Sequence, residues 1–143
     1  MKEIRAEIQI ASTIDKVWAI LMDLPNWPNW NPIVNRIEGN LQVGSELSIT
    51  MCDSKGKNGK SYKAIITSLD EKNKFSFIAT MMGKFMFSAD RIIELEDSEG
   101  GTLLIQREIY TGIMVLMFWG KLSTQAKAML NSMNEALKKK VEN

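Results

Sequence analysis

Four polar side chains near the end of the chain could act together if the strands that carry them lie side by side. In the segment Thr102–Gly112, residue alternation places Gln106, Glu108 and Tyr110 on one face of a predicted strand. Arg91 belongs to the preceding predicted strand and would lie near Glu108 if both faces point the same way. Such a group can orient a carbonyl, hydroxyl or carboxylate of a bound molecule. Alternatively, Arg91 and Glu108 form an internal ion pair that only fixes the register of the strands.

Any reaction at these residues would have to run without an imidazole, because the chain contains no histidine. This excludes Ser-His-Asp and Cys-His schemes and removes the commonest metal ligand. Carboxylates, hydroxyls, tyrosine, lysine or arginine would have to carry the chemistry, and Glu108 and Tyr110 are the candidate catalytic residues. The acidic residues of the predicted turns show no converging set of ligands, so we expect no metal site and no cofactor.

Composition and charge narrow the classes of function. The net charge is +1 and the lysines are scattered, so we expect no nucleic-acid partner. The longest apolar run, Ile113–Trp119, is far shorter than the roughly 20 residues that cross a bilayer. Cys52 is the only cysteine, which excludes an internal disulfide and, with no apolar leader at Met1–Ile10, favours a cytoplasmic setting. The ten methionines could be core filler or a cavity lining that adapts to apolar ligands.

The length of 143 residues fits a single domain spanning residues 1–143. The spacing of its apolar residues predicts the helices and strands that must position the polar group. Ser12 or Thr13 can cap a short helix that must end before Pro25, and a second short helical corner follows. A long helix is expected from Met117 to Val141, where apolar residues recur every three or four positions. Alternation and turn residues predict seven strands: Lys2–Ile10, Ile33–Glu38, Glu46–Cys52, Ser61–Leu69, Lys74–Met81, Phe85–Glu96 and Thr102–Gly112.

This order of elements predicts a cavity. A long helix with an apolar stripe must lie against a large apolar surface, and the concave face of a twisted antiparallel sheet is the one available. A sheet of six or seven strands around one helix cannot fill its own interior completely. The remaining space is concave, apolar and enclosed, which is typical of a small-molecule site.

Several motifs along the chain then resemble a known superfamily. They are the proline-rich stretch Asp23–Pro32, Ile37-Glu-Gly39, Glu108-Ile-Tyr-Thr-Gly112 and Met133-Asn-Glu-Ala-Leu-Lys138. Together they resemble the START-like superfamily and, within it, the polyketide cyclase/dehydrase or SRPBCC branch. The resemblance covers essentially the whole chain and implies an α+β helix-grip fold with a ligand cavity between the sheet and the C-terminal helix. Members bind lipids, sterols, quinones and polyketides, and only some of them are enzymes.

The resemblance also implies which face of the last strand looks inward. Periodicity alone leaves both faces possible, and the family pattern matches the face with Gln106, Glu108 and Tyr110. Related sequences often carry histidines in the last two strands, where this chain has Gln106 and either Asp90 or Arg91, so an imidazole mechanism is not expected. The predicted ligand-binding residues are Trp30, Phe77, Phe87, Arg91, Gln106, Glu108, Tyr110, Leu122, Ala126, Met129 and Met133.

Three functions remain possible from the sequence. The leading hypothesis is a monomeric or homodimeric protein that binds a hydrophobic or amphipathic small molecule, such as a lipid, a quinone or a polyketide-like compound. The first alternative is a polyketide cyclase, aromatase or dehydratase that uses Glu108 or Tyr110. A further alternative is a protein-interaction or chaperone-activator module, which would need an exposed apolar patch on the outer sheet face, where Leu103, Ile105 and Ile109 would lie.

Overall fold

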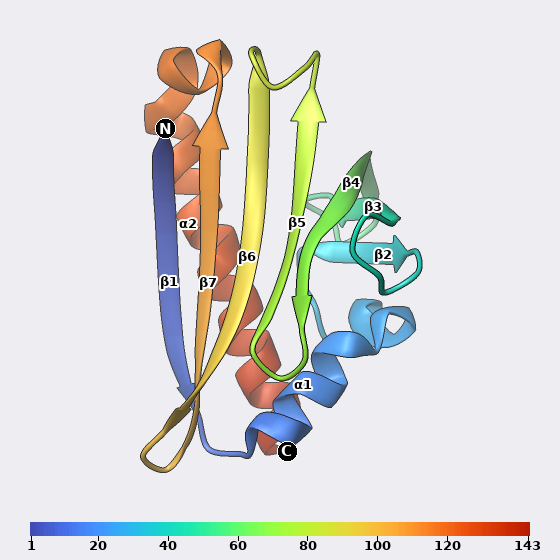
Figure 1. The fold of residues 1–143 in the computed structure, drawn as a ribbon, viewed down its shortest axis with the longest axis vertical. Coiled ribbons are helices and arrows are strands. Elements are labelled where there is room, and N and C mark those ends of the chain that lie inside the picture. The colour runs from blue at the N-terminus through green and yellow to red at the C-terminus, as the bar shows by residue number, and fades with distance from the viewer.

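The computed structural model describes residues 1–143 as seven strands, two α-helices and one short 3-10 helix (Figure 1). Most bounds agree with the predicted ones within a few residues. In chain order, the elements are β1 (Lys2–Ile10), α1 (Ile14–Met22), the 3-10 helix η1 (Leu24–Asn29), β2 (Val34–Glu38), β3 (Glu46–Cys52), β4 (Asn58–Asp70), β5 (Lys74–Met81), β6 (Phe87–Ser98), β7 (Gly101–Thr111) and α2 (Ile113–Glu142).

All seven strands belong to one antiparallel sheet in the order β1-β7-β6-β5-β4-β3-β2. The first strand of the chain therefore pairs with the last one, with Lys2 opposite Tyr110 and Ile10 opposite Thr102. The remaining strands follow one another as a meander, which short turns between antiparallel neighbours favour. The predicted α+β helix-grip fold is confirmed.

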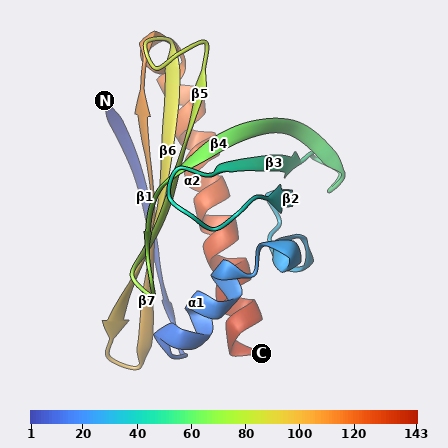
Figure 2. The same cartoon turned by 45° about the vertical axis from the view of Figure 1, so that its right-hand side comes forward.

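The sheet bends strongly over its second half. The register shifts once in each of the pairs β2–β3, β3–β4 and β4–β5. Such bulges bend a strand and increase its local twist. Figure 2 shows β2, β3 and the first part of β4 extending sideways from the long strands. This bend gives the sheet the concave face that α2 covers.

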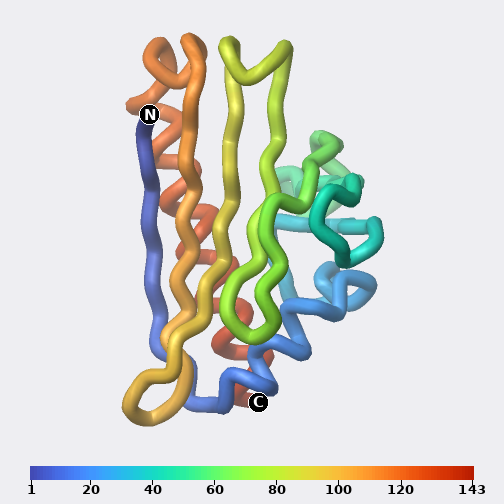
Figure 3. Tube along the Cα trace, in the orientation of Figure 1, coloured from blue at the N-terminus to red at the C-terminus, as the bar shows by residue number.

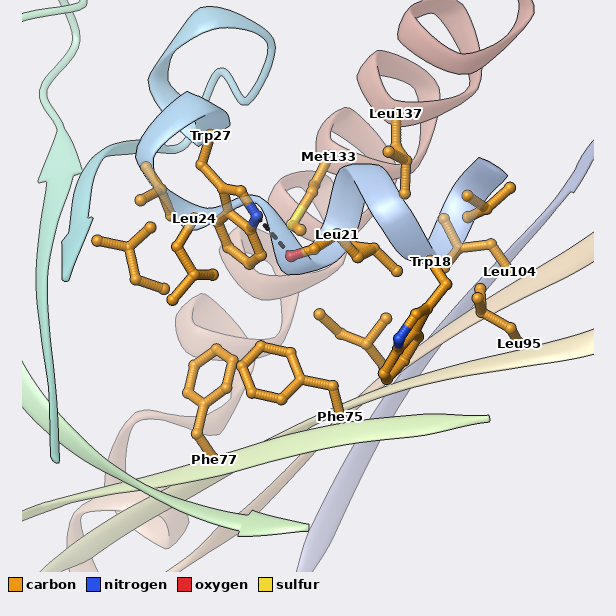
Figure 4. Packing of buried hydrophobic residues seen from close by; sticks show 14 of the residues in the cluster. Trp18, Leu21, Leu24, Trp27, Phe75, Phe77, Leu95, Leu104, Met133 and Leu137 are labelled. Carbon is orange, nitrogen blue, oxygen red and sulfur yellow. Dashed lines mark hydrogen bonds between the residues drawn. The ribbon is translucent and has the colours of Figure 1, made fainter. Parts of the chain in front are cut away.

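The segment after β1 forms the predicted pair of short helices. The side chain of Thr13 caps α1 by accepting a hydrogen bond from the backbone N–H of Lys16 at 3.3 Å. The chain then turns at Pro25 into η1, and Trp27 Nε1 donates to the carbonyl oxygen of Leu21 at 2.9 Å (Figure 4). This buried bond fixes the corner against α1, so the proline-rich stretch is an ordered part of the core.

The helix α2 begins earlier than predicted. It starts at Ile113, directly after Gly112, and is interrupted at Phe118, where φ is −119° and ψ is 18°. Gly112 has a φ of 115°, and a Cβ there would lie 2.3 Å from the carbonyl oxygen of Met86. Only glycine fits such a turn, and it lets the chain pass from strand to helix without a loop. The run after Gly112 is apolar on every side, so periodicity did not mark it as helical.

No helix in the structure is long and apolar enough to cross a lipid bilayer.

Most of the buried hydrophobic residues belong to two clusters of very different size. The larger one has 21 buried residues and lies between the sheet, α1, η1 and the C-terminal half of α2 (Figure 4). The smaller one consists of Tyr110, Val115 and Ala126, near the start of α2. The interior is therefore filled toward the C-terminus of α2 and is thinly packed toward its beginning. The site lies in this thinly packed region.

Candidate ligand-binding site

A cavity of about 390 Å³ lies between the concave face of the sheet and α2. Strands β3 to β7 form its floor and walls, and the middle of α2 forms its roof. Most of its lining is hydrophobic, which suits an apolar ligand. The 17 lining residues are Met51, Lys60, Ser61, Tyr62, Phe77, Ala79, Thr80, Met81, Phe87, Ala89, Arg91, Glu108, Tyr110, Leu122, Gln125, Ala126 and Met129.

A charged pair interrupts the apolar lining on the floor. Arg91 on β6 stands directly opposite Glu108 on β7, and its Nε donates to Glu108 Oε2 at 2.6 Å. The hydroxyl of Tyr110 donates to the other oxygen, Glu108 Oε1. The side chains of Arg91 and Glu108 are only 13% and 14% exposed. Both carboxylate oxygens therefore already accept hydrogen bonds, and the group is largely shielded from bulk water.

A second layer of hydrogen bonds holds Arg91 from below. Arg91 Nη1 donates to Gln106 Oε1 at 3.2 Å, and Gln106 Nε2 donates to Asn134 Oδ1 on α2 at 2.7 Å. Both amide side chains are buried. Arg91 Nη1 also lies 3.8 Å from the sulfur of Met133. The network therefore connects two strands with the helix, and it fixes the direction in which the guanidinium points.

The environment keeps the polar groups of the floor in one protonation state. Burial raises the pKa of Tyr110, and the neighbouring carboxylate of Glu108 raises it further. Burial also raises the pKa of Tyr62, on the opposite wall. For Arg91, burial alone would lower the pKa, but the charge of Glu108, the hydrogen bond to it and the two tyrosines together outweigh burial, and the net pKa is raised. At neutral pH the cavity thus presents two protonated tyrosines and a cationic arginine.

The structure brings most of the predicted site residues together around this cavity. Three of them lie outside its lining. Gln106 and Met133 are fully buried beneath Arg91, and Trp30 packs against Trp27 with ring centroids 5.7 Å apart. The predicted residues that line the cavity are Phe77, Phe87, Arg91, Glu108, Tyr110, Leu122, Ala126 and Met129.

Sequence reasoning missed the lining that comes from β3, β4 and the end of β5. Tyr62 shares a face of β4 with Ala64 and Ile66, which are both buried. In the same way, Ala79 lies on the face of β5 that carries Phe77. The alternation therefore contained the signal for these positions. The other lining residues that were not predicted are Met51, Lys60, Ser61, Thr80, Met81, Ala89 and Gln125.

A curved sheet closed by one helix around an apolar space defines a helix-grip protein with an internal site. Residues 1–142 match the family described as "Polyketide cyclase / dehydrase and lipid transport". The chain belongs to this family, as its motifs predicted. No curated protein matches the chain.

Solved structures share the fold at low sequence identity. Protein CV1439 from Chromobacterium violaceum is 11% identical, with a TM-score of 0.77, over 100% of this chain and 99% of that one. DynU16, a putative protein in the dynemicin biosynthetic locus, is 15% identical, with a TM-score of 0.78, over 100% of this chain and 48% of its own. The di-domain ARO/CYC StfQ from the steffimycin pathway is 16% identical, with a TM-score of 0.66, over 97% of this chain and 48% of its own. At such identities the likeness concerns the fold alone.

Proposed function

We propose that the cavity binds a hydrophobic or amphipathic small molecule, of the lipid, quinone or polyketide-like kind, with one polar end. The observation that carries this proposal is the position of the Arg91–Glu108–Tyr110 group on the floor of an otherwise apolar cavity. Binding sites for small molecules typically combine an apolar lining with a few convergent polar groups, in volumes of about 300–1,000 Å³. A cavity of about 390 Å³ suits a molecule at the smaller end of that range.

The hydrogen bonds of the floor indicate the chemistry of the polar end. Arg91 donates through Nε and Nη1, and its Nη2 makes no hydrogen bond within the protein. The hydroxyl of Tyr110 is already used as a donor to Glu108. A carbonyl or carboxylate on the ligand would therefore be held best by Arg91 Nη2, and a ligand hydroxyl could donate to a remaining lone pair of Glu108.

The first test is to identify what the purified protein carries, by native mass spectrometry and organic extraction. The affinity of that compound for Glu108→Gln is then compared with that for the wild type. We expect the affinity to fall by roughly 1.5–3 kcal/mol, because the substitution removes the charge from one hydrogen-bonding group while keeping its shape.

The chain offers a matched control for this substitution. Glu94 accepts from Arg107 Nε at 2.9 Å, an equivalent pair of charges across β6 and β7 on the outer face of the sheet. Glu94→Gln should leave the affinity unchanged. If both variants bind equally well, or if no small molecule occupies the cavity under any condition, the proposal is wrong.

A cyclase, aromatase or dehydratase activity is the second candidate. It is favoured by the protonated hydroxyl of Tyr110, which lies on the floor and is hydrogen-bonded to a carboxylate. If Glu108 or Tyr110 transfers a proton, then Glu108→Gln or Tyr110→Phe should lower turnover by about 10²–10⁴-fold while substrate affinity stays nearly intact. Because both oxygens of Glu108 already accept hydrogen bonds, we favour binding over proton abstraction.

The third candidate, a protein-interaction or chaperone-activator module, was expected to show an apolar patch on the outer sheet face. Ile105 is buried there, and Leu103 and Ile109 are only partly exposed. No observation on this face favours the third candidate.

A further inference from the structure

One end of the molecule exposes an unusual amount of hydrophobic surface, which we call the apolar tip. It combines the loop between β5 and β6 with the first turns of α2, at the top of Figure 1. Phe85, Met82 and Leu116 are 76%, 77% and 71% exposed. The complete set of large exposed hydrophobic residues at the tip is Met1, Met81, Met82, Phe85, Ile113, Leu116, Met117 and Phe118.

Hydrophobic side chains are otherwise rarely exposed in this protein. Outside the tip, the large exposed hydrophobic residues are Leu41, Val43 and Ile65. Single apolar residues on a surface are ordinary, whereas a contiguous group of them marks a surface that contacts another molecule or a membrane. The gathering of exposed hydrophobic residues at one end therefore indicates that the tip contacts another molecule or a membrane.

Backbone hydrogen bonds make the two segments of the tip one surface. The N–H of Ile113 donates to the carbonyl oxygen of Phe85 at 3.0 Å, and the N–H of Met114 donates to that of Met86, also at 3.0 Å. A shallow depression brings Met1 and Lys84 together with Phe85, Ile113 and Leu116. The tube in Figure 3 shows the loop and the helix start next to each other at the same end. The apolar side chains are thus held in place by a defined backbone.

The charges of the tip segments themselves are all positive, and the nearest carboxylate along β6, that of Asp90, interacts with Lys84. Residues 75–89 and 109–134 contain no aspartate or glutamate, and their basic residues are Lys84, Lys121 and Lys127. Lys2 is also at this end, with its Nζ 5.8 Å from the ring centroid of Trp119. The acidic residue next to Lys2 in sequence, Glu3, is paired with Arg107 at 3.1 Å. Exposed hydrophobic residues beside an excess of lysines are what an anionic lipid surface attracts.

We infer that the apolar tip docks on the surface of an anionic membrane. Phe85, Met82 and Leu116 would enter the boundary between headgroups and acyl chains, while Lys84 and Lys121 would stay at the level of the lipid phosphates. A second copy of the chain fits the charges less well. A two-fold contact through the tip would bring the lysines of both copies together, and the tip segments themselves carry no carboxylate to neutralise them.

The tip adjoins the cavity, because Met81 belongs to both. Phe87 and Leu122, which line the cavity, follow the tip segments closely in sequence. A docked molecule would therefore hold its cavity near the lipid. The docking itself is a property of the protein surface and does not depend on whether the cavity binds a ligand.

The test is flotation of the purified full-length chain with lipid vesicles, without any added ligand. We expect binding to vesicles of phosphatidylcholine mixed with phosphatidylglycerol, weak binding to phosphatidylcholine alone, and a loss of binding as the salt concentration rises. The double variant Phe85→Ser, Leu116→Ser should bind at least about tenfold more weakly, since even half-burial of two such side chains contributes that much. The matched control is Val43→Ser, Ile65→Ser, which removes exposed hydrophobic residues elsewhere and should bind like the wild type.

The charges are tested separately. Lys84→Gln, Lys121→Gln should reduce binding to the anionic vesicles by about 25-fold and flatten its salt dependence, since each lysine near the surface contributes roughly a fivefold factor. The control is Lys139→Gln, Lys140→Gln, at the other end of α2. It should change neither the binding to anionic vesicles nor its salt dependence. All these side chains are exposed, so circular dichroism should show wild-type folding in every variant.

Three results would overturn the inference. One is equal binding to anionic and neutral vesicles, or none to either. Another is unchanged binding by Phe85→Ser, Leu116→Ser. The last is a wild-type dimer in analytical ultracentrifugation that these two substitutions dissociate, which would make the tip a contact between copies of this chain.

Discussion

The two ends of α2 face very different surroundings. Around its C-terminal half, Met133, Leu137 and Val141 are fully buried in the larger core, together with α1 and η1. From its middle toward its N-terminus, Met129 and Leu122 face a cavity, and Leu116 faces solvent. We call these regions the closed end and the open end. One helix therefore stabilises the fold with one part and leaves space for a ligand with the other.

The difference arises from what the chain supplies to each end. The segment between β1 and β2 adds two short helices at the closed end, where Leu24 and Trp27 fill the interior. Nothing equivalent covers the open end, where the bent strands β3 and β4 stand away from the helix (Figure 2). Since close packing contributes most of the stabilisation in a core, the stability of the fold should reside mainly at the closed end.

The largest effect is expected from truncating one methionine at each end. Met133→Ala should lower the free energy of unfolding by about 2–5 kcal/mol, because the site is fully buried and would leave an enclosed cavity. Met129→Ala, one turn earlier on the same helix, should cost less than about 1.5 kcal/mol, because its side chain already borders an open space. Urea unfolding of both variants measures the two values. Equal costs would mean that the open end is packed as a core.

A smaller effect on stability is expected at the open end, where the two tyrosines make the free energy of unfolding depend on pH. Tyr62 and Tyr110 both line the cavity, and burial raises the pKa of both. In the unfolded chain they lose their protons near their ordinary pKa of about 10, whereas the folded protein keeps them protonated to higher pH. The resulting stabilisation is complete below pH ~10 and is lost as the pH rises through the folded-state pKa values, by up to about 1.4 kcal/mol per pH unit for each tyrosine.

Two measurements examine this pH dependence. Just above pH ~10, the native protein should show no ultraviolet absorbance of phenolate. This absorbance should appear only when the protein unfolds. The loss of stability with pH should be weaker in Tyr110→Phe and in Tyr62→Phe than in the wild type. Ordinary tyrosine titration in the native state would show that the open end is filled with water.

The smallest effect concerns the helix that fills the closed end. Thr13→Ala removes the side-chain cap of α1 and should cost about 1 kcal/mol. Ser132→Ala, at an exposed position of α2, is the control and should change the stability by less than about 0.5 kcal/mol. Vesicle and ligand binding should be the same in both variants. A change in either would show that the two ends are coupled through α2.

The sequence was most informative about the strands. Turns such as Asp70-Glu-Lys-Asn73 and alternation predicted β5 at its observed bounds, Lys74–Met81, and β3 at Glu46–Cys52. It was least informative about the start of α2. The run from Ile113 to Trp119 has no amphipathic period, because several of its apolar side chains face solvent at the tip.

The residues of the site could be predicted only in part. Alternation and family motifs placed Glu108 and Tyr110 on the inner face, and the register of β6 and β7 sets Arg91 opposite Glu108. Periodicity shows which face of the sheet a side chain lies on, but it does not show whether that side chain reaches the cavity or is buried in the core. Gln106, only two residues from Glu108, is buried under α2, while Glu108 reaches the cavity. The depth depends on where α2 crosses the strand, since Gln106 donates to Asn134 of that helix, and this tertiary contact has no signature in the local sequence of the strand.

The pairing of β1 with β7 affects how the chain can fold. Ile10 meets Thr102 in the sheet, although most of the chain lies between them. During synthesis, β1 emerges before the other six strands of the sheet and has no strand to pair with until β7 has been made. Pairings between segments so far apart close slowly, because the entropy of a long loop is lost before the contacts form. The earliest strand of the sheet is thus among the last to join it, and until then its unpaired edge is open to aggregation in the nascent chain.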